Sequence, residues 1–305
     1  MSDTEGYSAA SEVGAVRVRR TRMQRIWLDL KKAPISAWFG MFVLVFYAIC
    51  AIFAPWIAPY GEADSSFAAY EPWSSDHIFG TDQIGRDIFS RLVYGARNTI
   101  GIALATTILA FVIGGGLGLV AAINRSWLDQ ILSRGVDVLM AIPSLIFALM
   151  LLSIFGSTVW NLIVIIAVLD STRVFRLTRS VAVGVVVMDY VEAARLRGEG
   201  LAWVMRREIL PNILPPMVAE FGLRFSFVFL TIAALSFLGV GVQPPTADWG
   251  SMVRENASLI QFAQFDIKAG MTPLLPAAAI ALLTVAVNFI VDWFLHKTSG
   301  LRDDH

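Results

Sequence analysis

The chain has 305 residues, of which 56% are apolar and 16% are charged, and its mean hydropathy is +0.66. Soluble proteins carry about 25% charged residues, so this composition excludes an ordinary soluble domain and favours a membrane protein. The 24 basic and 24 acidic residues balance, which leaves no overall attraction to nucleic acid, and the single Cys50 excludes an internal disulfide.

The chain begins with a polar and basic segment, residues 1–37, that we expect to be cytoplasmic. The apolar run that follows, 38–57, is too long and starts too late for an ordinary secretory signal, so we expect no cleavage. It has the length of about 20 residues that crosses a bilayer as a helix, and it is the first predicted transmembrane helix.

Five further apolar runs have this length, which predicts an all-α transmembrane fold with six spanning helices. The five later helices are expected at 98–124, 136–155, 158–176, 213–242 and 269–291. The third and fourth come from one uncharged run that is too long for a single crossing, and Gly156 and Ser157 divide it. Pro143 removes a backbone hydrogen bond from the third helix, so we expect a kink there.

The positions of lysine and arginine support this count, because cytoplasmic loops of membrane proteins are rich in both. With a cytoplasmic N-terminus, the inner segments receive most basic residues, including those of 17–32 and 173–207. The outer segments receive Arg86, Arg91, Arg97, Arg254 and Lys268. We therefore expect a multi-pass protein of the cytoplasmic (inner) membrane with outer loops at 58–97 and 243–268, a short tail at 297–305, and both termini in the cytoplasm.

The cytoplasmic segment 189–211 differs in composition from a simple connector, and it predicts two short amphipathic helices joined at glycines. Ala193 and Ala194 favour helix, and Gly198 permits a turn. Pro211 cannot continue a preceding helix but suits the first turn of the next one, so we expect it to mark the start of the fifth span. Such a charged helical elbow predicts a docking element, and a plain amphipathic loop helix is the alternative.

Several motifs resemble a known family. Glu192-Ala193-Ala194, Gly198 and Leu210-Pro211 are similar to the EAA loop of ATP-binding-cassette importer permeases. Three further segments resemble the dipeptide, oligopeptide and nickel branch of these permeases. They are the stretches 79–97 and 235–250, and Asp137 with Ala141-Ile142-Pro143. Two features depart from the family pattern, namely Glu208 at a position that is usually apolar and the short polar ending of the chain.

The resemblance implies a six-helix permease bundle of the type I importer class, with a core at 98–296 and a cytoplasmic coupling helix. It implies ATPase-coupling roles for Tyr190, Glu192, Ala193, Ala194, Arg195, Gly198, Leu210 and Pro211. The implied partners are a homologous permease subunit, two cytoplasmic ATPase subunits or one heterodimer, an extracytoplasmic substrate-binding protein, and membrane lipid. Dipeptides or short oligopeptides are the implied cargo, and nickel or another small solute is the alternative.

The sequence has no phosphate-binding loop of the form Gly-x-x-x-x-Gly-Lys-Ser/Thr. We therefore expect no cofactor on this chain, with ATP and Mg²⁺ bound by the partner ATPase subunits. His77, His296 and His305 are scattered and no His-Glu-x-x-His pair occurs, so we expect neither a metal site nor a catalytic centre. A self-sufficient secondary transporter or channel is the alternative class, but it predicts internal repeats, and no convincing repeat is visible.

Charged residues within a span are costly and are functional candidates. Glu220 and Arg224 stand four residues apart in the favourable order, acid before base. They form either a structural ion pair or part of the translocation pathway that contacts a zwitterionic peptide. On the outer side, Arg86 and Asp87 either order their loop through a local ion pair or meet a delivery protein.

Two further patterns concern packing. Gly114 and Gly118 are small residues spaced by four, which predicts a close approach of two helices. Tryptophans near the predicted span ends are interpreted as interfacial anchors, and these are Trp38, Trp56, Trp73, Trp249 and Trp293.

Overall fold

The computed structural model describes residues 31–124 and 127–299. The chain divides into two units, Met1–Pro34 and Ile35–His305. Most of the predicted basic segment 1–37, and the end of the predicted tail from residue 300 on, lie outside the described residues. Within the described part of the second unit the structure is helical, with a single isolated β-bridge between Thr81 and Asp87.

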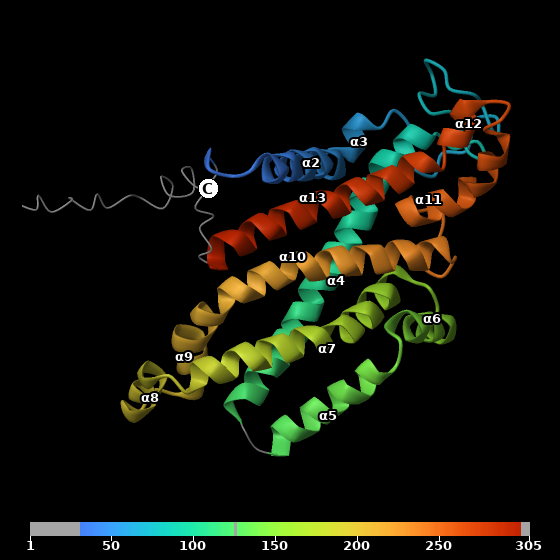
Figure 1. Ribbon diagram of the computed structural model, residues 1–305. Coiled ribbons are helices and arrows are strands. Elements are labelled where there is room, and N and C mark those ends of the chain that lie inside the picture. The colour runs from blue at the N-terminus through green and yellow to red at the C-terminus, as the bar shows by residue number, and fades with distance from the viewer. Residues whose placement is uncertain (1–30, 125–126, 300–305) are drawn as a thin grey trace, which may run out of the picture. The chain divides into compact units, whose positions relative to one another are not determined.

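Helices of very different length make up the second unit (Figure 1). In chain order they are α2 (Ile35–Ile52), α3 (Ala54–Ile57), α4 (Ile88–Ile123), α5 (Trp127–Ala141), α6 (Ser144–Phe155), α7 (Val159–Val186), α8 (Asp189–Leu196), α9 (Leu201–Val204), the π-helical turn η1 (Met205–Ile209), α10 (Leu210–Phe237), α11 (Trp249–Asn256), the 3-10 helix η2 (Ala257–Phe262), α12 (Ile267–Met271) and α13 (Leu274–Ser299). In Figure 1, α13 lies between α2 and α10, and α4 crosses obliquely to pack on α10 and α7.

Four helical stretches within the described residues are long and apolar enough to cross a membrane, at Ile35–Ile52, Ile88–Ile123, Leu201–Phe237 and Ile267–Lys297. The pair α5 and α6 makes a fifth if it counts as one bent span. Helix α7 is not among them, because Asp170, Arg173 and Arg176 interrupt its apolar run. By length and composition, the described residues therefore contain four or five candidate spans, compared with the six that the sequence predicts.

The predicted third helix, 136–155, was expected to kink at Pro143, and the structure breaks it at that position. It is divided between α5 and α6, which are bent by 89° relative to each other. The break lies at Ile142 and Pro143, because proline has no amide hydrogen to donate and also disfavours helical geometry in the residue before it. The expected kink is therefore a full corner.

Pro211 lies in the first turn of α10, as the sequence predicts, but no break separates α10 from the helical turns before it. Helical structure is continuous from Leu201 to Phe237, through η1. The amide of Leu210 bonds to the carbonyl of Met205, five residues back, which is the wider spacing of a π-turn. This turn lies directly before Pro211, whose backbone nitrogen has no hydrogen to donate to an ordinary helical hydrogen bond.

Helix α4 begins at Ile88, earlier than the predicted start at 98, because Asp87 caps it. The Asp87 carboxylate accepts a hydrogen bond of 2.7 Å from the amide of Ser90. Further along the helix, the prediction of close packing is confirmed. A Cβ added at Gly114 would lie 2.3 Å from the carbonyl oxygen of Ser171, and one at Gly118 would lie 2.8 Å from that of Phe175. The backbones of α4 and α7 therefore approach closely.

Two apolar clusters form the core, one among the long helices and one at the end that carries α8, α9 and η1. Large apolar side chains also cover the outside, including Phe42, Val112 and Ile154, which are 70%, 65% and 67% exposed. Such a surface is typical of contact with lipid. Trp249 differs from the prediction, since it is 1% exposed and its indole Nε1 donates to the Leu92 carbonyl at 2.9 Å. It is a core residue and not an interfacial anchor.

Candidate functional site

The elbow predicted at 189–211 is formed by α8, α9 and η1. Val191 and Ala194 on the inner side of α8 are fully buried and belong to the same apolar cluster as Val204 and Ile209. Gly198 has a φ of +84°, a left-handed backbone conformation that residues other than glycine rarely adopt. The turn at Gly198 therefore reverses the chain so that α8 folds back on the helix that follows.

The outer side of the elbow is exposed. Of the predicted coupling residues, only Ala194 is buried, and the exposed ones are Tyr190, Glu192, Ala193, Arg195, Gly198, Leu210 and Pro211. Two neighbouring leucines, Leu196 and Leu201, are 82% and 54% exposed. Apolar side chains among charged ones on an exposed helix are typical of a surface that docks a partner.

The second predicted pair, Glu220 and Arg224, belongs to a larger cluster between α7 and α10. Arg224 Nε lies 2.6 Å from Glu220 Oε1, and Arg224 Nη1 lies 3.7 Å from Asp170 Oδ1. Arg173 Nη1 donates to the same Asp170 oxygen at 3.2 Å, and the Arg224 guanidinium stands 4.9 Å from the centre of the Phe227 ring. The cluster contains two acids and two bases, so its formal charges cancel.

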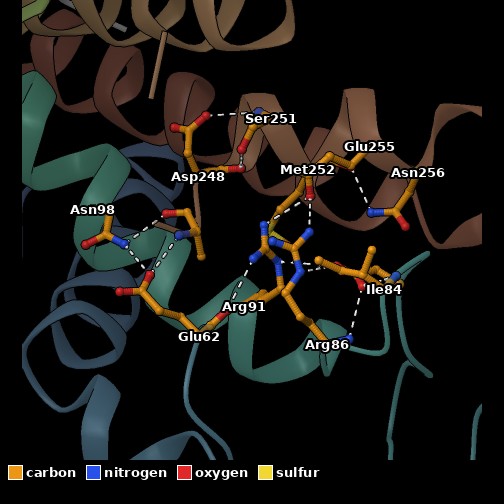
Figure 2. A network of polar contacts seen from close by, with 12 residues as sticks. Glu62, Ile84, Arg86, Arg91, Asn98, Asp248, Ser251, Met252, Glu255 and Asn256 are labelled. Carbon is orange, nitrogen blue, oxygen red and sulfur yellow. Dashed lines mark hydrogen bonds and ion pairs between the residues drawn. The ribbon is translucent and has the colours of Figure 1, made fainter. Parts of the chain in front are cut away.

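A third group of charges, absent from the sequence predictions, lies where the segment before α4 meets α11 (Figure 2). We call it the outer network, and its members are Glu62, Asp82, Arg86, Arg91 and Glu255. Glu255 Oε2 accepts hydrogen bonds from Arg86 Nη2 at 2.7 Å and from Arg91 Nη2 at 3.1 Å. Asp82 Oδ2 receives Arg86 Nε at 2.6 Å, and Arg91 Nη1 donates to the Glu62 carbonyl at 3.2 Å. Arg91 is only 1% exposed.

The outer network continues through Glu62 to the start of α11. Its Oε2 accepts hydrogen bonds from Asn98 Nδ2 at 2.8 Å and from the amide of Ala247 at 2.7 Å. The next residue, Asp248, caps α11 and accepts from Thr99 Oγ1 at 2.9 Å. Burial raises the pKa of the Asp248 carboxyl, while hydrogen bonds such as that from Thr99 oppose the rise. The network thus fixes both outer segments to α4.

Arg86 and Asp87 were expected to pair with each other or with a delivery protein. Each has another partner instead. Arg86 is 3% exposed and joins the outer network, while Asp87 Oδ1 lies 2.9 Å from Nδ1 of His77. Both residues therefore order the loop, but by contacts across it and not by a pair between neighbours.

One feature of the sequence could have pointed to the outer network, but the count of basic residues on each side of the membrane did not use it. Arg86 and Arg91 were two of the few basic residues assigned to the outer side, and acids at 62, 82 and 255 lie in the same outer segments. Which acid meets which base depends on the tertiary fold. Within the described residues there is no group of three or more His, Cys, Asp or Glu side chains that could hold a metal ion.

Comparison with known proteins decides the family. Residues 114–297 match the family described as binding-protein-dependent transport system inner membrane component, and residues 21–72 match the N-terminal transmembrane domain of oligopeptide transport permease C. The chain belongs to this permease family.

Individual relatives of this permease align over almost all of it. The dipeptide transport system permease protein DppC of Escherichia coli K12 is 37% identical over 300 residues, which cover 96% of this permease and 95% of the relative. The di/tripeptide transport system permease protein DppC of Pseudomonas aeruginosa is 34% identical over 271 residues, covering 87% and 85%. A chain of a crystallised amino acid ABC transporter has 22% identity and a TM-score of 0.46, covering 68% and 94%.

Family membership makes the chain a multi-pass inner-membrane permease subunit of an ATP-binding-cassette importer. Transport that depends on a binding protein requires a separate binding protein and separate ATPase subunits. The permease is accordingly a transport subunit. Its function depends on the surfaces that contact the binding protein and the ATPase subunits.

Proposed function

We propose that this permease is one of two membrane-spanning subunits that import dipeptides or short oligopeptides. The identity of 37% to a dipeptide permease over 96% of the chain supports this cargo. ATP and Mg²⁺ would be bound by the partner ATPases. Proteoliposomes that hold the complete importer should take up labelled Ala-Ala only with ATP and the binding protein. Uptake of nickel in place of peptide, or transport by this chain alone, would contradict the proposal.

We further propose six crossings with both termini cytoplasmic, with α7 as a crossing in spite of its charges. The support is the basic stretch 173–207, which belongs in the cytoplasm under the positive-inside rule, and the closely packed α4, which runs alongside α7.

A pair of reporter fusions tests the crossing of α7. Alkaline phosphatase needs the oxidising side of the membrane for its disulfides. Fused after Ser157 it should be active, and fused after Gly198 it should be inactive. Equal activity at both sites would mean that α7 does not cross.

We also propose that the exposed side of α8 docks on an ATPase subunit. The support is its geometry, because Val191 and Ala194 hold the helix to the core while Tyr190, Glu192 and Ala193 face outward. Coupling through this helix would transmit ATPase closure to α10, which follows α9 and η1 without a break.

Ala193→Arg should weaken that contact without unfolding the permease, because Ala193 is exposed. A bulky charge in the centre of an interface costs about tenfold or more in affinity. We expect loss of co-purified ATPase and of peptide-stimulated ATP hydrolysis at normal membrane levels. The same change at Ala69, an exposed residue of the outer loop, is the control and should leave ATPase binding intact. Full co-purification of ATPase with the Ala193→Arg protein would refute docking through this surface.

A further inference from the structure

Asp170 has a buried carboxylate oxygen that the fold does not satisfy. The residue is 5% exposed, and among the described residues its Oδ2 has no hydrogen-bond partner. Both neighbouring guanidiniums, those of Arg173 and Arg224, approach Oδ1 instead. Native proteins satisfy most buried polar atoms, and an exception at an ionisable group of a membrane protein is a functional candidate.

Asp170 and Arg173 line a hollow of about 150 Å³ between α6, α7 and α10. Ser144 and Thr231 add polar groups to its wall. A second hollow of about 330 Å³, beside the corner between α5 and α6, shares Ser144, Leu169 and Arg173 with the first. The unsatisfied acid therefore borders a space that a small solute can enter.

The charges select the kind of solute. Asp170, Arg173, Glu220 and Arg224 already sum to zero, so a lone cation or anion would leave an unbalanced charge in a poorly solvated site. A zwitterion adds one charge of each sign. Arg173 can receive its negative end, because its side chain is 44% exposed and its guanidinium carries five N–H donors.

In the structure Arg173 Nη1 lies 3.2 Å from Asp170 Oδ1, so a short peptide would bind by separating this pair. Residues three apart on a helix have Cβ atoms about 5–6 Å apart, and the arginine side chain extends this reach. The two termini of an extended dipeptide are about 7 Å apart. Rotation of a carboxylate about its last torsion is soft, so Asp170 can turn either oxygen toward the hollow.

We propose that Asp170 and Arg173 form a subsite for a zwitterionic dipeptide during its passage. Asp170 accepts hydrogen bonds from the terminal ammonium, and Arg173 donates to the terminal carboxylate. Arg224, which also pairs with Glu220 at 2.6 Å, lies 3.7 Å from Asp170 Oδ1 and holds Asp170 in place. This inference rests on the proposed peptide import and adds residues that bind the cargo.

Protection of a cysteine in the hollow provides the test. The reporter is Thr231→Cys in a Cys50→Ala background, which removes the native cysteine. The complete importer in proteoliposomes is labelled with a small neutral thiol reagent, with the binding protein and saturating Ala-Ala present or absent. Ala-Ala should slow labelling about tenfold, and adding Asp170→Asn should abolish most of this protection, since a charge-assisted hydrogen bond is worth about that factor.

Arg173→Gln gives a second reading if the Asp170→Asn protein folds poorly, because Arg173 is partly exposed. Asp137→Asn is the matched control, since it removes an exposed ion pair between α5 and Arg176 of α7. Protection should fall in Arg173→Gln and persist in Asp137→Asn. If the unmodified importer takes up Ala-Ala but protection is unchanged in Asp170→Asn or Arg173→Gln, the subsite alone is refuted. If the unmodified importer takes up no peptide, the proposed function fails and the subsite fails with it.

Discussion

Arg91→Gln should destabilise the permease by about 3–5 kcal/mol, because it removes one of the two arginines that neutralise the buried carboxylates of Asp82 and Glu255. Arg86 still reaches both acids but cannot replace the contact between Arg91 and the Glu62 carbonyl. We expect a low level of the protein in membranes and a large fall in its unfolding temperature in detergent.

Arg97→Gln is the control for this change, because Arg97 lies on the same helix but is exposed. It should alter the unfolding temperature little. Equal stability of the Arg91→Gln and Arg97→Gln proteins would show that the outer network contributes nothing to stability. A selective loss in Arg91→Gln would show that the outer segments are held to α4 by these ion pairs.

Gly114→Ala should separate α4 from α7. The new methyl would lie 2.3 Å from the Ser171 carbonyl oxygen and 2.8 Å from the Val174 side chain, and a backbone atom cannot move aside as a flexible side chain can. Overpacking of this kind costs about 1–3 kcal/mol. Because Ser171 follows Asp170, the displaced backbone should also disturb the charged cluster, and we expect reduced stability together with slower peptide uptake.

Gly116→Ala provides the matched control, two residues along the same helix. Apart from its chain neighbours and the backbone of its own helix, no atom lies within 4 Å of a Cβ added there. Since alanine favours helix over glycine by about 1 kcal/mol, this protein should be as stable as the unmodified one or more so. Thermal unfolding of both variants in detergent compares them directly, and equal losses would mean that the close approach of α4 and α7 is unimportant.

The helical class, the apolar stretches and the glycine contact followed from the sequence, because each depends on local composition or on spacing along one helix. Glu220 and Arg224 pair as predicted, since four residues bring two side chains together on any helix. The 36-residue length of α4 was missed, because a search for apolar runs stops at the first charged residue. Such a search cannot anticipate that Arg91 is neutralised by an acid from another segment.

Contacts between distant segments set the limit of prediction. Glu255 meets Arg86 and Arg91 across more than 160 residues, and no spacing rule connects them. Trp249 was assigned to the interface by its position near a span end, but its burial depends on Tyr47, Leu92 and Phe229 from three other helices. Similarly, no spacing rule connects Asp170 with its partner Arg224, because the two residues lie far apart along the chain.

The passage of the helix through Pro211 has a mechanical consequence. Leu201–Phe237 contains 37 residues in helical conformation. At a rise of 1.5 Å per residue this is a helical path about 55 Å long, and it includes the π-turn η1 and the prolines Pro215 and Pro216 within α10. The turn at Gly198 lies before this path, so in the proposed coupling a displacement of α9 would enter α10 through helix and not through a loop.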